Sequence, residues 1–386
     1  MSPLTREAVT DVAHAIGMAT IGPAAASVDH DARFPHEGIG ALREERLLGA
    51  LIPVEFGGAG LSFSAVATIC QTLGQYCAST AMIYAMHQIQ VACIVRHARD
   101  TAYFRDYLAD LAERQGLIAS ATSEIGVGGD VRTSVCAVER DGGNFTLTKQ
   151  APVISYGQYA DDYLITARRE PDSPPSDQVI LLARRSDTTL EQTNNWDTLG
   201  FRGTCSPGFR LSTRGSCSQI LPVPYADVSS QTMLPVSHIL WSSLWTGIAG
   251  DAVRRARAFV RNEARKSAGT VPPAALRAVE AMCALQSMRA NVEEATQEYE
   301  SSMDDPDALT ALRFAIRMNN LKMASSAAVV DIVGQSMLIC GMAGYKTESP
   351  YSVSRHLRDA YGAMLMINND RIAAASASML LVSKDD

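Results

Sequence analysis

The sequence predicts an α+β protein in which a helical segment is followed by a β segment and then by a four-helix bundle. Three observations support this fold class. Apolar residues such as Val9 and Val12 recur at helical spacing near the amino terminus. After Gln115-Gly116, alternating residues and turn signals replace that spacing. Helical periodicity returns at about Leu234 and continues to the end of a 386-residue chain, which is long enough for two or three domains.

Residues 1–116 are predicted to form an all-helical domain. Glycines and a proline break the first helical pattern over residues 49–60, which predicts a loop. Ser62 or Ser64 is suited to cap the helix that follows. We expect that helix to end at about Tyr76, with two more helices over residues 79–98 and 101–114.

Residues 117–230 are predicted to form a small β barrel or sandwich. The Asp-Gly-Gly-Asn sequence at residues 141–144 is typical of a hairpin turn. Short runs rich in β-branched residues recur on both sides of it. The expected strands cover residues 131–138, 144–148, 162–168, 178–184 and 209–211.

Residues 231–386 are predicted to form an antiparallel four-helix bundle. Prolines such as Pro235, Pro306 and Pro350 stand at the starts of the apolar-periodic segments, where a helix tolerates them. The expected helices cover residues 235–267, 272–303, 306–339 and 351–383.

The composition excludes several classes of function. The net charge of −7 comes from scattered charges, and no basic run is present, so we expect no nucleic-acid partner. Eight dispersed cysteines without a CxxC pair predict reduced thiols in a cytoplasmic protein, and no metal site is expected. The apolar run over residues 80–95 contains His87 and two glutamines, so we expect no membrane span.

Two stretches combine small residues with polar ones. Residues 122–131 (TSEIGVGGDV) carry three glycines and two hydroxyls between expected strands. Residues 340–372 carry a small-residue turn before Tyr345 and then Arg358-Asp359-Ala360. These stretches resemble the Thr-Glu-Pro-Gly-Ala-Gly-Ser-Asp loop and the Arg-Asp-Ala step of the acyl-CoA dehydrogenase family. The order helical, β, four-helix bundle matches that family's architecture, and the resemblance covers roughly residues 45–375.

Three further stretches resemble flavin-site motifs of the family. Val153-Ile154-Ser155-Tyr156-Gly157 resembles the strand whose hydroxyl reaches flavin N5, with Val153 in place of a Trp. The turn at residues 199–204 resembles a Leu-Gly-x-Arg-Gly-Ser/Thr motif, in which Arg202 would hold the turn together. Arg265 resembles the Arg that binds the flavin pyrophosphate, although it is equally well read as a cation at a helix carboxyl end.

The resemblance implies FAD as the cofactor and an acyl thioester as the substrate. A loop of exposed amides suits an isoalloxazine ring, since reduced flavin carries negative charge near N1. The implied substrate residues are Gly129, Thr204 and Ile367. The implied cofactor residues are Thr122, Ser123, Gly128, Gly129, Ser155, Arg265, Gly341, Gly344, Asn368 and Asn369.

The chain departs from the family at the catalytic base. In the family, a Glu removes the substrate proton, and Ile367 stands at that place here. The alternative place, on the first bundle helix, falls near Leu240, and His238 is the only titratable group near it. Asp370 is the nearest carboxylate and becomes the candidate base, although a helix-end acid paired with Arg371 or solvent is the simpler interpretation.

Three hypotheses remain open at this point. The first is an acyl-CoA dehydrogenase-like enzyme that oxidises the α,β-bond of a CoA- or carrier-protein-bound acyl group, with hydride transfer to flavin N5 and a non-standard base. The second is a flavin-dependent monooxygenase that uses reduced flavin and oxygen. The third is a flavin-binding protein with little activity. An electron-transfer flavoprotein or a flavin reductase would be the redox partner, and the resemblance implies a homodimer or homotetramer.

Overall fold

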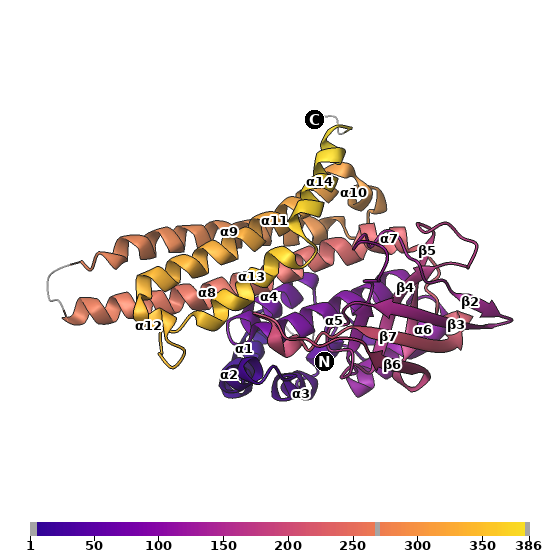
Figure 1. The fold of residues 1–386 in the computed structure, drawn as a ribbon, viewed down its shortest axis with the longest axis horizontal. Coiled ribbons are helices and arrows are strands. Elements are labelled where there is room, and N and C mark those ends of the chain that lie inside the picture. The colour runs from indigo at the N-terminus through magenta and orange to yellow at the C-terminus, as the bar shows by residue number, and fades with distance from the viewer. Residues whose placement is uncertain (1–5, 267–270, 383–386) are drawn as a thin grey trace.

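The computed structural model describes residues 6–266 and 271–382. The protein is elongated: a long helical bundle forms one end and the β strands form the other, with the amino-terminal helices packed below the junction (Figure 1). The largest buried apolar cluster contains side chains from all three segments, so they share one core. The α+β fold with helical first and last segments is confirmed.

The first segment is helical on both sides of a connection over residues 45–62, which contains the predicted loop. Its helices agree with the predicted ends of residues 79–98 and 101–114 within one or two residues. Ser62 caps α4, since its Oγ accepts a hydrogen bond from the N–H of Ala65 at 3.2 Å. The elements are α1 Arg6–Ile16, a π turn Gly17–Ile21, α2 Gly22–His30, α3 His36–Glu44, α4 Phe63–Gly74, α5 Ala78–His97 and α6 Ala102–Arg114.

Two helices of the described residues, α5 and α11 Leu312–Cys340, are long and apolar enough to cross a membrane. Core helices of other proteins have the same length and composition. In α5, 94% of the most apolar window is buried inside the protein.

The β segment forms two sheets. One has the order β1-β4-β5, with β1 parallel to β4, and the other has the order β2-β3-β7-β6. The predicted hairpin is confirmed, because Asp141 pairs with Asn144 across the turn. The strands are β1 Ile118–Ala121, β2 Glu139–Asp141, β3 Asn144–Ala151, β4 Asp162–Arg168, β5 Gln178–Arg184, β6 Thr188–Gln192 and β7 Phe209–Ser216.

The strand predicted over residues 131–138 is wrong. The N–H groups of Val135 and Cys136 bond to the carboxylate of Glu124, so they are unavailable for a sheet ladder. The segment makes only one bridge, from Ala137 to Arg168, before β2 begins at Glu139. The prediction also missed β6, a mostly exposed polar strand at a sheet edge.

The last segment is built on three long helices, α8 Leu234–Lys266, α9 Ala274–Ser302 and α11, with the shorter α13 Ser354–Leu365 beside α8 and α11. Short helices α7 Tyr225–Val228, α10 Pro306–Thr310 and α12 Met342–Tyr345 connect them. The predicted ends at residues 267 and 383 lie outside the described residues.

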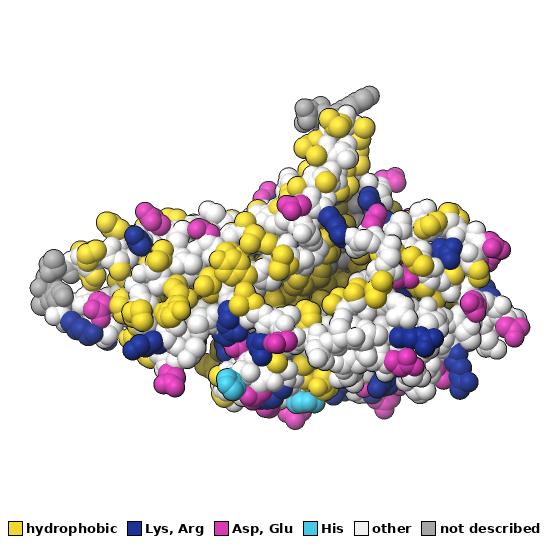
Figure 2. Space-filling view, in the orientation of Figure 1, with side chains coloured by type: hydrophobic (Ala, Val, Ile, Leu, Met, Phe, Trp, Pro, Cys, Tyr) yellow, Lys and Arg dark blue, Asp and Glu magenta, His cyan; other side chains and the backbone are white. Residues whose placement is uncertain are grey.

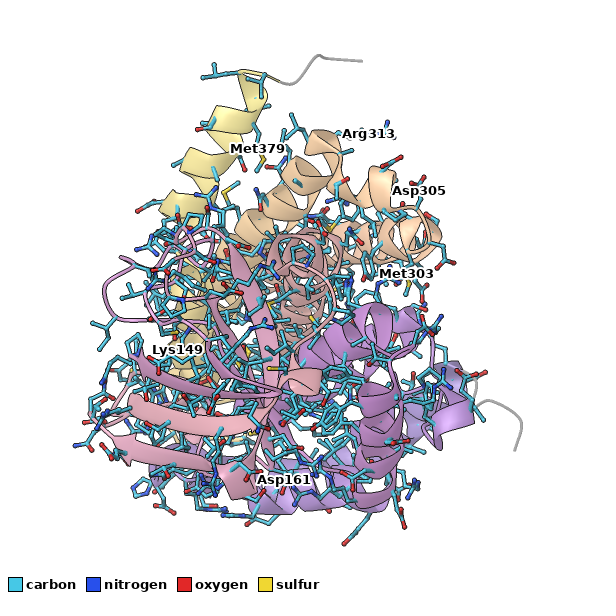
Figure 3. The ribbon with its side chains drawn as sticks, turned by 90° about the vertical axis from the view of Figure 1, so that its right-hand side faces the viewer. Lys149, Asp161, Met303, Asp305, Arg313 and Met379 are labelled. Atoms are coloured by element: carbon cyan, nitrogen blue, oxygen red, sulfur yellow. The ribbon has the colours of Figure 1, made fainter. Side chains whose placement is uncertain are left out.

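Two predicted bundle helices are each divided in two. Ala311 is extended (φ −62°, ψ 138°) and separates α10 from α11. Residues 366–368, which we call the corner, separate α13 from α14 Asn369–Leu380. Ile367 in the corner has a left-handed φ of 46°, and Asn368 caps α14 through the N–H of Asp370 at 2.7 Å. As a result α14 stands away from the body of the protein, with Met379 near its outer end (Figure 3).

Candidate flavin site

A hollow floored by hydrophobic side chains lies between the base of α14, the bundle and the β segment (Figure 2). The glycine-rich loop (residues 122–131) and the corner are joined beside it, because Arg371 on α14 donates a hydrogen bond to the carbonyl of Gly128. Gly128 and Gly129 both have positive φ and are exposed. The structure therefore brings two of the sequence-predicted stretches together.

A buried carboxylate anchors the glycine-rich loop. Glu124 accepts hydrogen bonds from the Ser134 hydroxyl and the Cys136 N–H, both at 2.6 Å, and lies 3.5 Å from the Nζ of Lys149. Lys149 is fully buried on β3 (Figure 3). Burial opposes the charge of Glu124, but Lys149 and the hydrogen bonds hold its pKa below the usual value. Glu124 is thus a fixed anion that shapes the loop.

The hydroxyls predicted to bind flavin or substrate differ in whether their proton is free for a ligand. Ser155 accepts a hydrogen bond from Ser206 at 2.9 Å, so its own proton is free for a ligand. Thr204 is only 3% exposed and lies behind Ser206 at 2.9 Å. Ser123 donates its proton to the carbonyl of Val153 at 3.0 Å. Thr122 is half-buried and its carbonyl accepts from Thr166 at 3.4 Å.

Backbone strain gathers around these groups. Seven non-glycine residues among those described have positive φ, and four of them flank Ser155, Thr204 or the corner. A bulky residue in this region is uncommon, and such strain often marks a functional site. The four are Tyr156, Phe201, Cys205 and Ile367.

The corner rests on polar side chains of α11 that the sequence analysis missed. Lys322, which is fully buried, donates from Nζ to the Ile367 carbonyl and to the Asn369 Oδ1, both at 2.7 Å. Asn369 also bonds to Ser326 at 3.0 Å. A lysine on a helix is usually interpreted as a solvent-exposed residue. The mostly apolar sequence around it, from Leu321 to Val330, was the one pattern that could have indicated its burial.

The groups near the expected base position are poor proton acceptors. Ile367 is apolar and 41% exposed, and Leu240 is buried. His238 is buried against the Met318 carbonyl, 3.1 Å from its Nδ1. Burial and the nearby Lys322 lower the pKa of His238 to about 3, so the imidazole is neutral at pH 7.

Asp370 is exposed in the first turn of α14. Asn369 and Ser376 of this helix bond to α11, and Arg371 bonds to the glycine-rich loop. Successive helical residues are turned by about 100°, so Asp370 points to the side of α14 opposite the gap between α11 and that loop. Its role as a base stays a prediction.

The remaining predicted cofactor residues lie at the other end of the bundle. Arg265 is exposed in the last turn of α8. Gly341 directly precedes α12, and Gly344 lies within it (Figure 1). About 27 residues of helix separate His238 from Arg265, or roughly 40 Å at 1.5 Å per residue. A single flavin cannot touch both ends within one chain.

Elsewhere the motif residues are structural. Arg358 pairs with Asp29, Arg355 donates to the Tyr76 carbonyl at 3.0 Å, and Arg202 donates to the Thr198 carbonyl at 2.8 Å. Asp359 is buried and accepts the Phe201 N–H at 2.7 Å. The contact of Arg202 agrees with its predicted turn-holding role, and the contacts of Arg358 and Asp359 fix α13 against the turn that carries Thr204.

The hydrogen-bond donors of these segments fit a flavin ring. The free protons of Ser155 and Asn369, the exposed amides of the glycine-rich loop and the uncompensated charge of Lys322 all favour an electron-rich, anion-forming ligand. Val153, at the place of the family's Trp, is a smaller side chain and is 40% exposed.

Comparisons with known proteins agree with this fold. The model of the acyl-CoA dehydrogenase N-terminal domain matches residues 4–115, and the model of the C-terminal domain matches residues 228–372. The cyclohex-1-ene-1-carbonyl-CoA dehydrogenase of Syntrophus aciditrophicus is 23% identical over 374 residues, which cover 93% of this chain and 86% of the relative.

Two solved structures represent the similar folds. FMN-bound TdsC from Paenibacillus sp. A11-2, a dibenzothiophene monooxygenase, has a TM-score of 0.86 at 18% identity and covers 98% of both chains. Butyryl-CoA dehydrogenase from Megasphaera elsdenii has a TM-score of 0.81 at 19% identity, covering 97% of this chain and 98% of that one. The same fold thus occurs in a dehydrogenase and in a monooxygenase.

Proposed function

The chain belongs to the acyl-CoA dehydrogenase family and is a flavin oxidoreductase, and from that premise we propose that it works as a flavin-dependent monooxygenase. In this proposal a reductase provides the reduced flavin. One atom of dioxygen enters the substrate, the other leaves as water, and the flavin supplies the two electrons. No α-proton needs to be removed from an acyl thioester.

The observation that carries the proposal is the chemistry of the corner. Removing an α-proton needs a positioned base of suitable pKa. The groups that the described structure joins by hydrogen bonds here are the side chains of Lys322, Ser326 and Asn369 and the backbone carbonyl of Ile367, and none is a carboxylate. His238 is neutral and weakly basic, and Asp370 points away.

The chain's own residues would hold the flavin ring through hydrogen bonds. Ser155 donates its free proton, the glycine-rich loop offers exposed N–H groups, and Asn369 offers its remaining amide proton. The apolar floor of the hollow would exclude water from the reacting region (Figure 2). The exposed Val153 leaves room for a substrate beside the ring.

For the cofactor we propose FAD shared between two copies of the chain. Arg265, Gly341 and Gly344 would then bind the pyrophosphate and adenosine of a flavin whose ring lies in the partner. Exposed apolar side chains at that end support a homodimer or homotetramer. They are Leu276, Val279, Met282, Leu338, Met342 and Tyr345. FMN, which would need only the ring residues, is the alternative.

A second candidate is an acyl-thioester dehydrogenase that uses Asp370 as its base. The dehydrogenase relatives favour it, and Asp370 forms no ion pair within the described residues. The substrate would be bound to CoA or to a carrier protein, and an electron-transfer flavoprotein would accept the electrons. The eight cysteines, free in the structure, support the proposal of a cytoplasmic protein in either case.

Two anaerobic titrations separate the candidates. Flavin-loaded protein is mixed with a panel of acyl-CoA thioesters while the absorbance of oxidised flavin is followed. Affinities for oxidised and for reduced flavin are measured in parallel. We expect no bleaching and tighter binding of reduced flavin. Bleaching by a thioester would overturn the monooxygenase proposal and establish the dehydrogenase.

A further inference from the structure

Lys322 is a buried cation without a carboxylate partner. Its side chain extends from α11 and is fully buried. It donates hydrogen bonds to the backbone carbonyl of Ile367 and to the side-chain amide oxygen of Asn369. No ion pair of Lys322 occurs within the described residues. Burial lowers the pKa of Lys322 to about 8, so the amine is still mostly charged at pH 7.

Such a charge is costly to bury. Removing an ammonium group from water without a counterion is unfavourable, even after the surrounding protein has relaxed. The carbonyl and amide oxygens offset part of this cost. An anion close to the corner would offset more, because the two groups that accept hydrogen bonds from Lys322, the Ile367 carbonyl and the Asn369 amide oxygen, are both neutral. Lys322 therefore favours a negatively charged ligand at the corner.

Lys322 also decides which way the amide of Asn369 faces. A lysine ammonium has three donors and no acceptor, so the atom of Asn369 next to Nζ must be Oδ1. The Nδ2 group then donates one proton to Ser326 at 3.0 Å and keeps a second proton. Since Asn369 is only partly buried, that second proton is available to a ligand.

The corner is held in a fixed conformation, so the orientation of the adjacent Asn369 amide is fixed as well. Ile367 adopts a left-handed conformation, with φ of 46°, which is unfavourable for a β-branched residue. That conformation is stabilised by the hydrogen bond from Lys322 to the Ile367 carbonyl and by Asn368, whose side chain caps α14. Asn319, one turn before Lys322, bonds Ser376 at 3.0 Å and helps to dock α14 on α11.

We propose that Lys322 is a positioning residue that turns the amide donor of Asn369 toward the bound flavin and makes the site prefer the reduced, anionic form of that flavin. This inference rests on the proposed flavin site but not on which reaction follows. Lys322 itself touches no cofactor, because it is buried beneath Asn369 and the Ile367 backbone.

The test compares the affinities for oxidised and reduced flavin, with FAD and FMN as probes, under anaerobic conditions. Lys322→Met removes the charge and the amide lock while keeping the volume. We expect the preference for reduced flavin to fall at least tenfold and the midpoint potential of the bound flavin to drop. Lys322→Arg should restore part of the preference. Asn369→Ser, which leaves the lysine in place, should lower it as well.

Asn319→Ala is the matched control, because it loosens α14 without touching Lys322. Equal losses of preference in Asn319→Ala and Lys322→Met would overturn the inference, since loose docking would then be the cause. An unchanged preference in Lys322→Met would also overturn it. If that variant does not fold, an unchanged preference in Asn369→Ser has the same force. A wild-type protein that binds no flavin would instead refute the proposed function.

Discussion

The guanidinium of Arg371 on α14 donates a hydrogen bond to the backbone carbonyl of Gly128 in the glycine-rich loop, 243 positions earlier in the chain. The same guanidinium occupies the space beside Gly129, where a Cβ atom would overlap it. A contact of two exposed groups contributes little energy in itself. Its importance is geometric, because it fixes the start of α14, next to the corner, relative to the loop.

Gly129→Ala should therefore displace Arg371 and weaken flavin binding by at most about fivefold, since an exposed contact is worth no more than about 1 kcal/mol and acts here only by fixing the loop. Amide hydrogen exchange in the first turn of α14 should speed up at the same time. Gly128→Ala is the matched control, since Gly128 also has positive φ but has open space where a Cβ would be. Equal effects of the two variants would mean that the backbone strain, and not Arg371, is responsible.

The sequence was most informative where local chemistry decides the structure. The Asp141–Asn144 turn and the Ser62 cap depend on residues within three positions of each other, and both were predicted. The 131–138 strand failed because its donors serve Glu124, a contact between two segments that no local pattern records. The prediction of one continuous helix over residues 351–383 failed for a similar reason, since the corner conformation of Ile367 is stabilised by Lys322, which is 45 positions away. Resemblance located the candidate site, but only packing revealed its buried cation.

Ser155→Ala should lower flavin affinity about fivefold, because one hydrogen bond of about 1 kcal/mol is lost. Thr204→Val should have a smaller effect, since Thr204 lies behind Ser206 and is almost fully buried. Titration of flavin fluorescence measures both. A larger loss in Thr204→Val than in Ser155→Ala would reverse the order in which we place the two hydroxyls.

Arg265→Ala should weaken FAD at least tenfold and leave FMN unchanged, because only FAD has the pyrophosphate and adenosine that would reach the partner's α8. Both affinities are measured on the same preparation by equilibrium titration, with the exposed Arg261 on the same helix mutated to Ala as a charge control. Equal loss for FAD and FMN would argue against a shared FAD, as would a monomeric protein that binds FAD tightly.

The free energy of unfolding should depend on pH through the titration of Asp359. Burial raises the pKa of this carboxyl to about 6, although the Phe201 N–H and nearby arginines favour the charged form. The folded state then binds more protons than the unfolded state between pH 4 and pH 6. The contribution of Asp359 to stability is present below about pH 4 and is lost as the pH rises through 6.

Asp359→Asn keeps an oxygen for the Phe201 N–H but removes the charge. Urea unfolding should show little difference from wild type near pH 4 and a variant that is more stable at pH 7, by about 1–3 kcal/mol for a pKa change of two units. The sharpest readout is the difference between the two proteins as a function of pH. A difference that stays constant from pH 4 to pH 7 would show that Asp359 does not titrate in this range.

The last prediction concerns Asp370, which decides between the two candidate reactions. If Asp370 were the base, Asp370→Asn would abolish flavin reduction by an acyl thioester while leaving flavin bound, because the amide cannot accept the α-proton. The direction of Asp370 on α14 leads us to expect instead that the variant behaves as wild type in flavin affinity and in its reaction with oxygen. Stopped-flow absorbance of the flavin measures the rate of its reduction by a thioester and the rate of its reaction with oxygen. A wild-type enzyme that is reduced by a thioester and a variant that is not would assign the base to Asp370 and require α14 to turn when substrate binds.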